Sequence, residues 1–145
     1  MKFDMNLSLG FILNKTALMS KTLFAQKIKE FDITPEQWSI IFRTVETKGL
    51  TQKEISDSTY KDQANITRTI DRLEKKGFLQ RESNKLDRRI INIHPTQKAI
   101  DIVDDITLCS SDFNDELTKG FSQDEKNQLI NLLDRVYKNL QKDNL

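Results

Sequence analysis

Residues 63–77 read QANITRTIDRLEKKG, and this stretch decides the fold. Its apolar residues Ile66, Ile70 and Leu73 recur at the spacing of one helical face, and Gly77 is typical of a helix end. Asp62 stands directly before the stretch and is a suitable N-cap residue. The pattern predicts a helix that packs through a single apolar stripe.

The opposite face of this helix carries side chains that can contact DNA bases. Asparagine and glutamine can bond adenine with two hydrogen bonds, arginine can bond guanine, and alanine or a threonine methyl can contact the thymine methyl. The expected base-contacting positions are Gln63, Ala64, Asn65, Thr67, Arg68 and Arg72. Taken alone, the pattern fits an ordinary amphipathic surface helix at least as well, so the neighbouring segments have to decide.

Two further helices are expected directly upstream. The segment 34–37, TPEQ, is a capping box with proline at the first helical position, and apolar residues follow it at helical spacing through Val45. Gly49 ends this helix, and the segment 51–54, TQKE, is a second capping box that opens a short helix around Ile55. Three helices in close succession, the middle one short, are typical of a helix-turn-helix.

Beyond Gly77 the sequence pattern changes from helical to partly alternating. The segments 78–82 (FLQRE) and 90–94 (IINIH) are short and β-prone, and the segment 83–89 (SNKLDRR) between them is polar. These segments predict a β-hairpin, or wing, with a basic tip.

The wing tip predicts a second contact with DNA. Arg88 and Arg89 can enter the narrow, electronegative minor groove, and Lys85 adds a further positive charge. Asp87 is expected to orient a neighbouring arginine, because a carboxylate can accept both arms of a guanidinium group. The alternative is a solvated charged loop with no contact to DNA.

Long helices flank the helix-turn-helix and the wing. They are expected over about 7–31 and 96–119; Gly120 then breaks the second, and the segment 122–125, SQDE, is a third capping box that opens a last amphipathic helix. The expected fold class is mainly α with a small β-hairpin, a winged helix-turn-helix flanked by long helices in a single domain over residues 1–145.

Composition and charge agree with a nucleic-acid-binding protein. The chain is 37% hydrophobic and 31% charged, no apolar run reaches the ~20 residues of a membrane span, and a single cysteine fits a reducing cytoplasm. Residues 63–98 hold nine lysines and arginines against four acidic residues, whereas residues 99–145 hold five against ten. This division suggests that one face approaches a polyanion, although ordinary scatter of surface charge would give the same totals.

Residues 34–96 resemble the MarR family of winged helix-turn-helix transcription regulators. The matching segments are TPEQW at 34–38, LTQKEI at 50–55, ITR at 66–68, DRLEKKGFL at 71–79, the Asp-x-Arg of 87–89 and the Pro-Thr of 95–96. The flanking helices agree with the family in length and order, so the resemblance covers nearly the whole chain. Two departures are Pro95, where the family usually has leucine, and Ala99, where glycine is usual; both put in doubt the angle at which the helix after the wing starts.

The resemblance implies a homodimer that binds two half-sites of a pseudo-palindromic operator. Residues 34–96 would form the DNA-binding part, and residues 1–33 and 97–145 the helical dimerisation part. The sequence supports this division, because the apolar stripes at both ends exceed what the core of one subunit can bury and because DNA would repel the acidic end. A monomer whose end helices wrap the winged part is the alternative.

The resemblance also implies a ligand-responsive repressor in the cytoplasm, although repression or activation depends on where the operator lies. Relatives commonly release DNA when a small aromatic or phenolic molecule binds between the dimerisation helices and the winged part. Phe11, Trp38 and Phe42 are the candidate lining residues here, and ordinary core packing is the alternative for each of them.

Other classes of function find little support in the sequence. It has no glycine-rich phosphate loop, no His-based nucleophile pair and no metal-ligand spacing, which argues against an enzyme and against a cofactor or metal. A lone His94 and a lone Cys109 cannot form a metal cluster, and Cys109 is expected to be a buried structural thiol. A winged helix that contacts only proteins is the remaining alternative, and it would be expected to lack the basic wing and the polar recognition turn.

Overall fold

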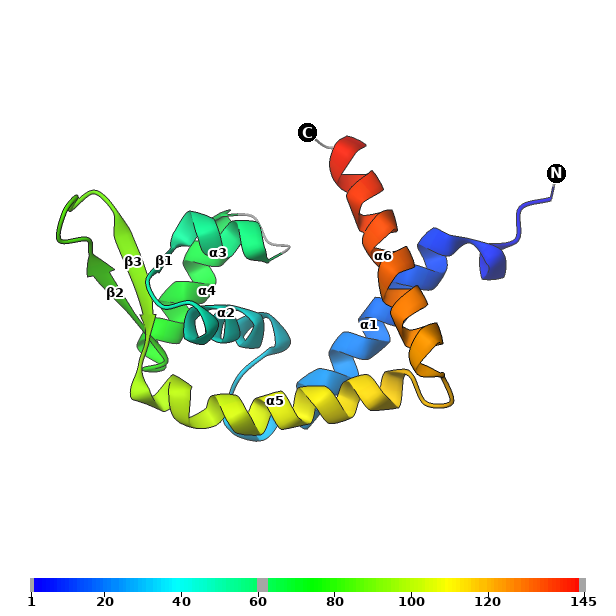
Figure 1. The fold of residues 1–145 in the computed structure, drawn as a ribbon, viewed down its shortest axis with the longest axis horizontal. Helices are drawn as coiled ribbons and strands as arrows, with labels where there is room; N and C mark the ends of the chain where they lie inside the picture. Colours follow the sequence, from blue (N-terminus) through cyan, green and yellow to red (C-terminus); the bar gives the residue numbers. More distant parts are fainter. Residues whose placement is uncertain (1, 60–62, 144–145) are drawn as a thin grey trace. The chain divides into compact units, whose positions relative to one another are not determined.

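The computed structural model describes residues 2–59 and 63–143 (Figure 1). These residues form two compact units. The boundary between the units lies inside one helix, between Ser110 and Ser111. The helices and strands are, in order, the short 3-10 helix η1 (Met5–Leu7), α1 (Leu9–Lys27), the short 3-10 helix η2 (Lys29–Phe31), α2 (Pro35–Glu46), β1 (Leu50–Thr51), α3 (Gln52–Ser58), α4 (Gln63–Lys75), β2 (Leu79–Ser83), β3 (Ile91–Pro95), α5 (Gln97–Leu117) and α6 (Gln123–Asp143). No helix in these two stretches combines the length and the apolar character needed to span a membrane.

The mainly α fold with a winged helix-turn-helix is confirmed, and the helix starts follow the expected capping chemistry. At Thr34 and Thr51 the side-chain oxygen accepts a hydrogen bond from the backbone three residues later, and the side chain there accepts from the backbone of the threonine in return. Ser122 and Glu125 make the same reciprocal pair before α6, at 2.9 and 3.1 Å. The expected cap of α4, Asp62, lies outside the described residues.

The N-terminal helix is shorter than the sequence predicted. α1 ends at Lys27, a 3-10 turn follows, and Asp32 then adopts a left-handed conformation with φ of 56°. This break turns Ile28 and Ile33 into the core, where they are 0% and 5% exposed. Because a continued α-helix would point successive residues around its circumference, burying both requires the chain to change direction.

α4 ends in the way that Gly77 predicted. The residue has a φ of 83°, and the backbone N–H groups of Gly77 and Phe78 donate to the carbonyls of Glu74 and Leu73 at 3.0 and 2.9 Å. This Schellman-type turn satisfies the last carbonyls of α4 and directs the chain at once into β2. β2 therefore follows α4 after only the three residues 76–78. From here on α4 is called the recognition helix, after the role that its sequence predicts.

The sheet is antiparallel and has the order β1-β3-β2. The sequence predicted the β2–β3 hairpin, and each of its strands begins and ends one residue later than expected. The two-residue strand β1 was not predicted; its Leu50 pairs with Ile93 and its Thr51 with Asn92. The wing is thus anchored on the segment between α2 and α3 as well as on its own hairpin.

One apolar core joins the helix-turn-helix, the sheet and the first half of α5. The apolar stripe of α4 is fully buried, and Ile55 of α3 and Ile93 of β3 are buried with it; the members of the core from α5 are Ala99, Val103 and Ile106. Fully burying one such aliphatic side chain contributes about 1.5–3 kcal/mol. The core therefore holds α4 firmly by one face and leaves its other face to solvent.

The start of α5 accommodates both departures from the family pattern. Pro95 is the last residue of β3, and the Thr96 hydroxyl donates to the Gly77 carbonyl at 2.6 Å and accepts from the Ala99 backbone at 3.4 Å. Ala99 itself is completely buried. The residue before α5 is therefore hydrogen-bonded to the turn that ends α4.

Candidate nucleic-acid interface

The polar face of α4 is directed to solvent, as its sequence predicted. Five of the six expected base-contacting side chains are exposed; these are Gln63, Ala64, Asn65, Arg68 and Arg72. Thr67 is half-buried, while Ile66, Ile70 and Leu73 on the other face are 0% exposed. A helix held by an apolar face and presenting amide and guanidinium groups on the other is suited to the DNA major groove.

Two of these side chains contact each other. Arg68 Nη2 donates to Asn65 Oδ1 at 2.5 Å, and the two residues lie one helical turn apart. The bond holds the guanidinium beside the amide near the start of α4. A base that bonds either group therefore meets a pair whose relative position is already set.

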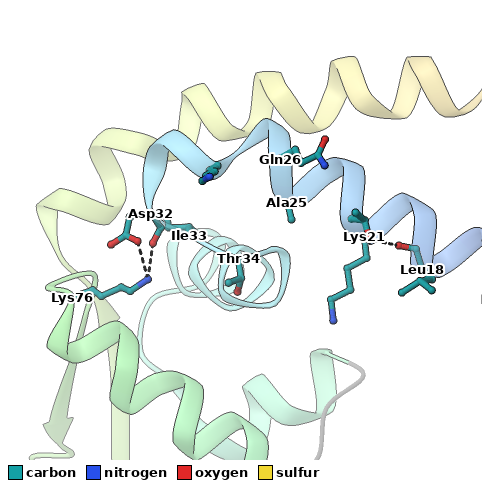
Figure 2. A pocket seen from close by; sticks show the side chains of 10 residues that line it. Leu18, Lys21, Ala25, Gln26, Asp32, Ile33, Thr34 and Lys76 are labelled. Atoms are coloured by element: carbon teal, nitrogen blue, oxygen red, sulfur yellow. Dashed lines mark hydrogen bonds and ion pairs between the residues drawn. The ribbon is translucent and has the colours of Figure 1, made fainter.

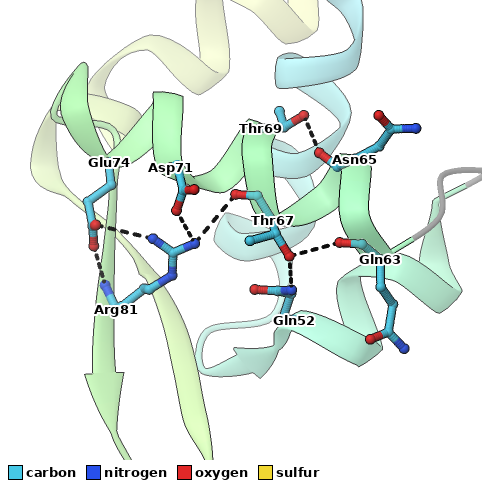
Figure 3. Close-up of polar contacts among 8 residues, drawn as sticks. All are labelled: Gln52, Gln63, Asn65, Thr67, Thr69, Asp71, Glu74 and Arg81. Atoms are coloured by element: carbon cyan, nitrogen blue, oxygen red, sulfur yellow. Dashed lines mark hydrogen bonds and ion pairs between the residues drawn. The ribbon is translucent and has the colours of Figure 1, made fainter.

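Thr67 serves the contact between α3 and α4 (Figure 3). Gln52 Nε2 donates to the Thr67 hydroxyl, which in turn donates to the Gln63 carbonyl at 2.9 Å. Since its hydroxyl is engaged inside the protein, any contact of Thr67 with a base has to involve its methyl group. No local sequence pattern points to Gln52, because its partner lies 15 residues away on another helix.

Arg81 of β2 holds three positions of α4 at once (Figure 3). Its guanidinium lies 2.6 Å from Asp71 and 3.2 Å from Glu74, and it donates to the Thr67 carbonyl at 3.5 Å. The Arg81 backbone N–H also donates to Glu74, at 3.1 Å. These bonds join β2, at the base of the wing, to α4. The positive charge of Arg81 compensates the negative charges of Asp71 and Glu74.

Sequence reasoning missed Arg81. A signal was present, because Asp71 and Glu74 lie on one face of the helix and an arginine follows in the next strand. Without the register of β2 against α4, however, the pattern is equally that of solvated surface charges. The tertiary arrangement is what brings the three groups together.

Asp87 contacts Arg89 with the geometry that the sequence analysis predicted. Arg89 Nε and Nη2 donate to the two carboxylate oxygens at 3.1 and 2.9 Å, and the Arg89 backbone N–H donates at 3.0 Å. The Arg89 guanidinium holds the pKa of Asp87 below its ordinary value, and the carboxylate in return raises the pKa of Arg89. The Arg89 side chain is 90% exposed, so the pair orients a cation that remains accessible.

The other two wing cations are exposed as well. Lys85 and Arg88 both lie in the loop between β2 and β3. Within the residues that the structure describes, neither side chain has a hydrogen bond or an ion pair. The wing tip therefore carries three accessible positive charges over five residues.

The three candidate effector residues lie on two helices, Phe11 on α1 and both Trp38 and Phe42 on α2. Trp38 and Phe42 pack on each other, with ring centroids 5.5 Å apart, and Trp38 belongs to the core. Phe11 is 39% exposed on α1, with the Lys15 amino nitrogen 5.5 Å from its ring centre. Cys109, expected to be buried, is partly buried and packs against the core.

A cavity of about 610 Å³ opens elsewhere in the first unit, and none of these aromatic residues lines it (Figure 2). Its walls come from α1, from η2 and the segment after it, and from Lys76 directly after α4. The apolar lining residues are Leu18, Ala25 and Ile33, and the basic ones are Lys21, Lys29 and Lys76. Lys76 Nζ donates to the Asp32 carbonyl at 2.7 Å and lies 3.5 Å from the Asp32 carboxylate. The end of the recognition helix is thus tied to the connection between α1 and α2.

Known proteins resemble this chain in sequence and in fold. The MarR family model matches residues 33–91. YybA of Bacillus subtilis (strain 168), an HTH-type transcriptional regulator, is 26% identical over 117 residues, which cover 81% of this chain and 78% of YybA.

Two solved structures superpose over most of the chain. BpsR of Bordetella bronchiseptica, whose DNA binding is regulated by 6-hydroxynicotinic acid, has a TM-score of 0.88 at 18% identity, covering 94% of this chain and 98% of BpsR. A mutant MarR from E. coli in complex with operator DNA has a TM-score of 0.83 at 27% identity, covering 90% of this chain and 94% of that one.

Proposed function

We propose that this chain is a transcription regulator of the MarR family, and that it binds double-stranded DNA sequence-specifically, as a homodimer on a pseudo-palindromic operator. Members of the family are regulators rather than enzymes. The observation that carries the proposal is the exposed amide and guanidinium face of α4, held from behind by a fully buried apolar stripe. The operator complex of the E. coli relative supports the same use of this fold.

We assign the base contacts to α4 and the flanking contacts to the wing. Gln63, Ala64, Asn65, Thr67, Arg68 and Arg72 are the proposed major-groove residues, and Lys85, Arg88 and Arg89 are the proposed wing contacts, with Asp87 orienting Arg89. The ion pairs of Arg81 support this assignment, because they compensate the carboxylates that would otherwise repel phosphate near the recognition helix.

The homodimer is supported by apolar side chains that stay exposed at both ends of the chain. On α1 they are Leu9, Phe11, Leu18, Met19 and Leu23, and on α6 they are Leu129, Ile130, Leu132, Leu133, Tyr137 and Leu140. Extended apolar surfaces of this kind mark interfaces in soluble proteins. Dimerisation through these helices leaves the two winged parts to bind two half-sites about one helical turn apart.

We further propose that a small anionic aromatic molecule regulates DNA binding, and that the protein acts as a repressor in the cytoplasm. The cavity lined by Leu18, Ile33 and Lys76 supports the ligand, since apolar walls suit an aromatic ring and lysines suit a carboxylate. A carboxylate that attracts Lys76 competes with Asp32 for it and so acts on the end of the recognition helix. The relative BpsR, whose DNA binding responds to 6-hydroxynicotinic acid, supports this chemistry.

Fluorescence anisotropy with fragments of the gene's upstream region tests the DNA-binding proposal. Wild type is titrated at several salt concentrations beside Arg88→Ala/Arg89→Ala, with Arg135→Ala/Lys138→Ala on α6 as a control of equal charge change. We expect nanomolar, sequence-selective binding with a steep salt dependence, and a slope reduced by about 1–2 only in the wing variant.

If the upstream region shows no selective binding, genomic fragments should be tested next, because the operator can lie elsewhere. No selective binding there would contradict the regulator and favour a winged helix that contacts only proteins. Adding a panel of aromatic carboxylates to the bound complex tests the ligand, with Lys76→Gln as the variant expected to lose the response.

A further inference from the structure

The tip of the wing is held in a defined conformation by Asn84. Its side-chain oxygen accepts hydrogen bonds from the backbone N–H groups of Leu86 and Asp87, at 2.9 and 3.2 Å. Its backbone N–H donates to the Ile90 carbonyl at 2.8 Å, and the Ile90 N–H donates to the Asp87 carbonyl at 3.1 Å. These four bonds close the loop 84–90 on itself.

The same asparagine ties the loop to the sheet behind it. Asn84 Nδ2 donates to Asn92 Oδ1 at 3.1 Å, and Asn92 Nδ2 donates to the Gly49 carbonyl at 2.7 Å. The chain of bonds thus runs from the wing tip through β3 to the residue before β1. Hydrogen bonds therefore hold the wing tip both within its own loop and to the sheet, so the tip residues keep a fixed direction.

The residue presented at this tip is a leucine. The side chain of Leu86 is 99% exposed, the most exposed of the large hydrophobic residues in the described part of the chain. Single exposed leucines are common and carry no argument by themselves. Here the backbone N–H of Leu86 donates to the Asn84 side chain, and this bond keeps the leucine in its exposed position. The residue lies among the accessible cations Lys85, Arg88 and Arg89.

We propose that Leu86 is a specificity-determining DNA contact, which packs into the minor groove when the wing cations bind; the inference rests on the proposed DNA-binding function. The surrounding positive charges select a polyanion as the partner, and the minor-groove walls offer apolar sugar carbons to a leucine. Apolar side chains are used in this groove by proteins that bend or widen DNA.

The chemistry of the groove predicts which base pairs Leu86 favours. A·T pairs present only acceptor atoms at the floor of the minor groove, whereas a G·C pair adds the guanine 2-amino group. A leucine covering that amino group removes it from water and offers it no acceptor, which is unfavourable. The wing should therefore prefer A·T pairs where it reaches the DNA, and the preference should depend on Leu86.

A comparison of protein variants and modified operators tests this inference. Hydroxyl-radical footprinting locates the base pairs under the wing. They are the pairs whose minor groove is protected by wild type but not by Arg88→Ala/Arg89→Ala. At these positions A·T is replaced by G·C or by inosine·cytosine, which lacks the 2-amino group. Wild type, Leu86→Ala, Leu86→Met and Asn84→Ala are titrated on each duplex.

For wild type we expect binding about 10-fold weaker on G·C than on A·T, with inosine·cytosine close to A·T. Leu86→Ala should lose about 5- to 20-fold in affinity for the A·T operator, reduce the discrimination to less than about 2-fold and leave the salt slope unchanged. Leu86→Met should keep the discrimination, and Asn84→Ala should lose it with the leucine still present.

Two results would overturn the inference while leaving the proposed function intact. One is a Leu86→Ala variant that binds as wild type does, and the other is a loss of affinity that is equal on all three duplexes. Selective binding by wild type in either case keeps the regulator. A wild type that binds no DNA selectively would overturn the proposed function and this inference together.

Discussion

At the scale of the residue, Arg81 illustrates how a side chain can serve recognition without lying on the recognition helix. It is three-quarters buried and bonds Asp71, Glu74 and the Thr67 carbonyl of α4. Its removal leaves two carboxylates of that helix unpaired. Arg81 is therefore a positioning residue whose loss changes both the angle and the charge of α4.

We expect Arg81→Gln to weaken DNA binding about 10-fold and to lower the free energy of unfolding by about 1 kcal/mol. The slope of affinity against salt should stay unchanged, because Arg81 is proposed to contact no phosphate. Anisotropy titrations at several salt concentrations and urea unfolding measure the two effects. Neutralising the partners as well, in Asp71→Asn/Glu74→Gln/Arg81→Gln, should recover part of the affinity. A slope that falls by about one would identify Arg81 as a direct phosphate contact instead.

Asp87 allows a test in which two physical accounts predict opposite signs. If only net charge mattered, Asp87→Asn would strengthen binding to DNA, because it removes a negative charge from the wing. Because Asp87 orients Arg89 through two side-chain bonds, we expect the substitution to weaken binding severalfold. Glu82→Gln, which removes an exposed acidic charge from β2, is the matched control and should not weaken binding.

The pH dependence of the same pair follows from the direction of its pKa shifts. Arg89 lowers the pKa of Asp87 below its ordinary value, so the pair is present near neutral pH and is lost only as the pH falls through the lowered pKa. The affinity ratio between wild type and Asp87→Asn should therefore be constant from about pH 5 to pH 8. A ratio that changes within this range would assign the effect to another group.

At the scale of the element, α3 is short but supports the recognition helix. The Thr51–Glu54 capping box opens this seven-residue helix, and its first residue, Gln52, bonds the Thr67 hydroxyl of α4. An isolated helix of this length is not stable in water, so its cap and its buried Ile55 carry it. A substitution that disrupts the N-terminus of α3 should therefore also affect the position of α4.

We expect Thr51→Ala to lower the free energy of unfolding by about 1 kcal/mol and to weaken DNA binding as well. Ser122→Ala removes the equivalent capping box from α6 and is the matched control. It should cost a similar amount of stability without affecting base recognition. Urea unfolding and anisotropy measure both properties, and equal losses of affinity in the two variants would contradict a specific link from α3 to α4.

The same elements mark how far the sequence could predict the structure. Capping boxes and apolar stripes predicted α2, α4, α5 and α6, because both are local and repeat within a few residues. The two-residue strand β1 was missed, because so short a strand has no alternation of its own and exists only by pairing with β3. The break after α1 was missed for a related reason, since the burial of Ile33 requires packing partners that no local pattern names.

The candidate site likewise contains some features that the sequence predicts and others that it does not. The exposed face of α4 and the Asp87–Arg89 pair could be predicted, since they depend on helical periodicity and on two neighbouring residues. Arg81, Gln52 and the hydrogen bonds of Asn84 could not, because each joins residues from different elements or depends on the conformation of the loop. Phe11, Trp38 and Phe42, the residues expected at an effector site, do not line the cavity beside α1, whose walls join segments far apart in the sequence.

At the scale of the whole molecule, charge and apolar surface are distributed unequally along the chain. Cations concentrate between residues 63 and 98, and acidic residues after residue 99. Exposed apolar side chains concentrate on α1 and α6. The proposed DNA binding and the proposed dimerisation should therefore be altered separately by substitution.

We expect wild type to sediment as a dimer at micromolar concentration and Leu133→Asp on α6 to sediment as a monomer. The substitution places a charge on the exposed apolar stripe, where a dimer interface would have to bury it without a partner. Asn131→Asp adds the same charge to the same helix and is the control. The monomer should bind a full operator far more weakly than the dimer, because only one half-site contributes per molecule. A wild type that sediments as a monomer would contradict the dimer.

The pairing of β1 with β3 also sets an order of events while the protein is being made. The residues that close the sheet, such as Gly49 and Asn92, are 43 positions apart, and the helix-turn-helix lies between them. At about 5–20 residues per second, a ribosome needs seconds to pass from one to the other. Throughout that interval the nascent helices lack the strand that covers them, and their isoleucines remain open to chaperones and to other unfinished chains. The winged helix should therefore fold only after residue 95 has left the ribosome, as one cooperative step rather than helix by helix.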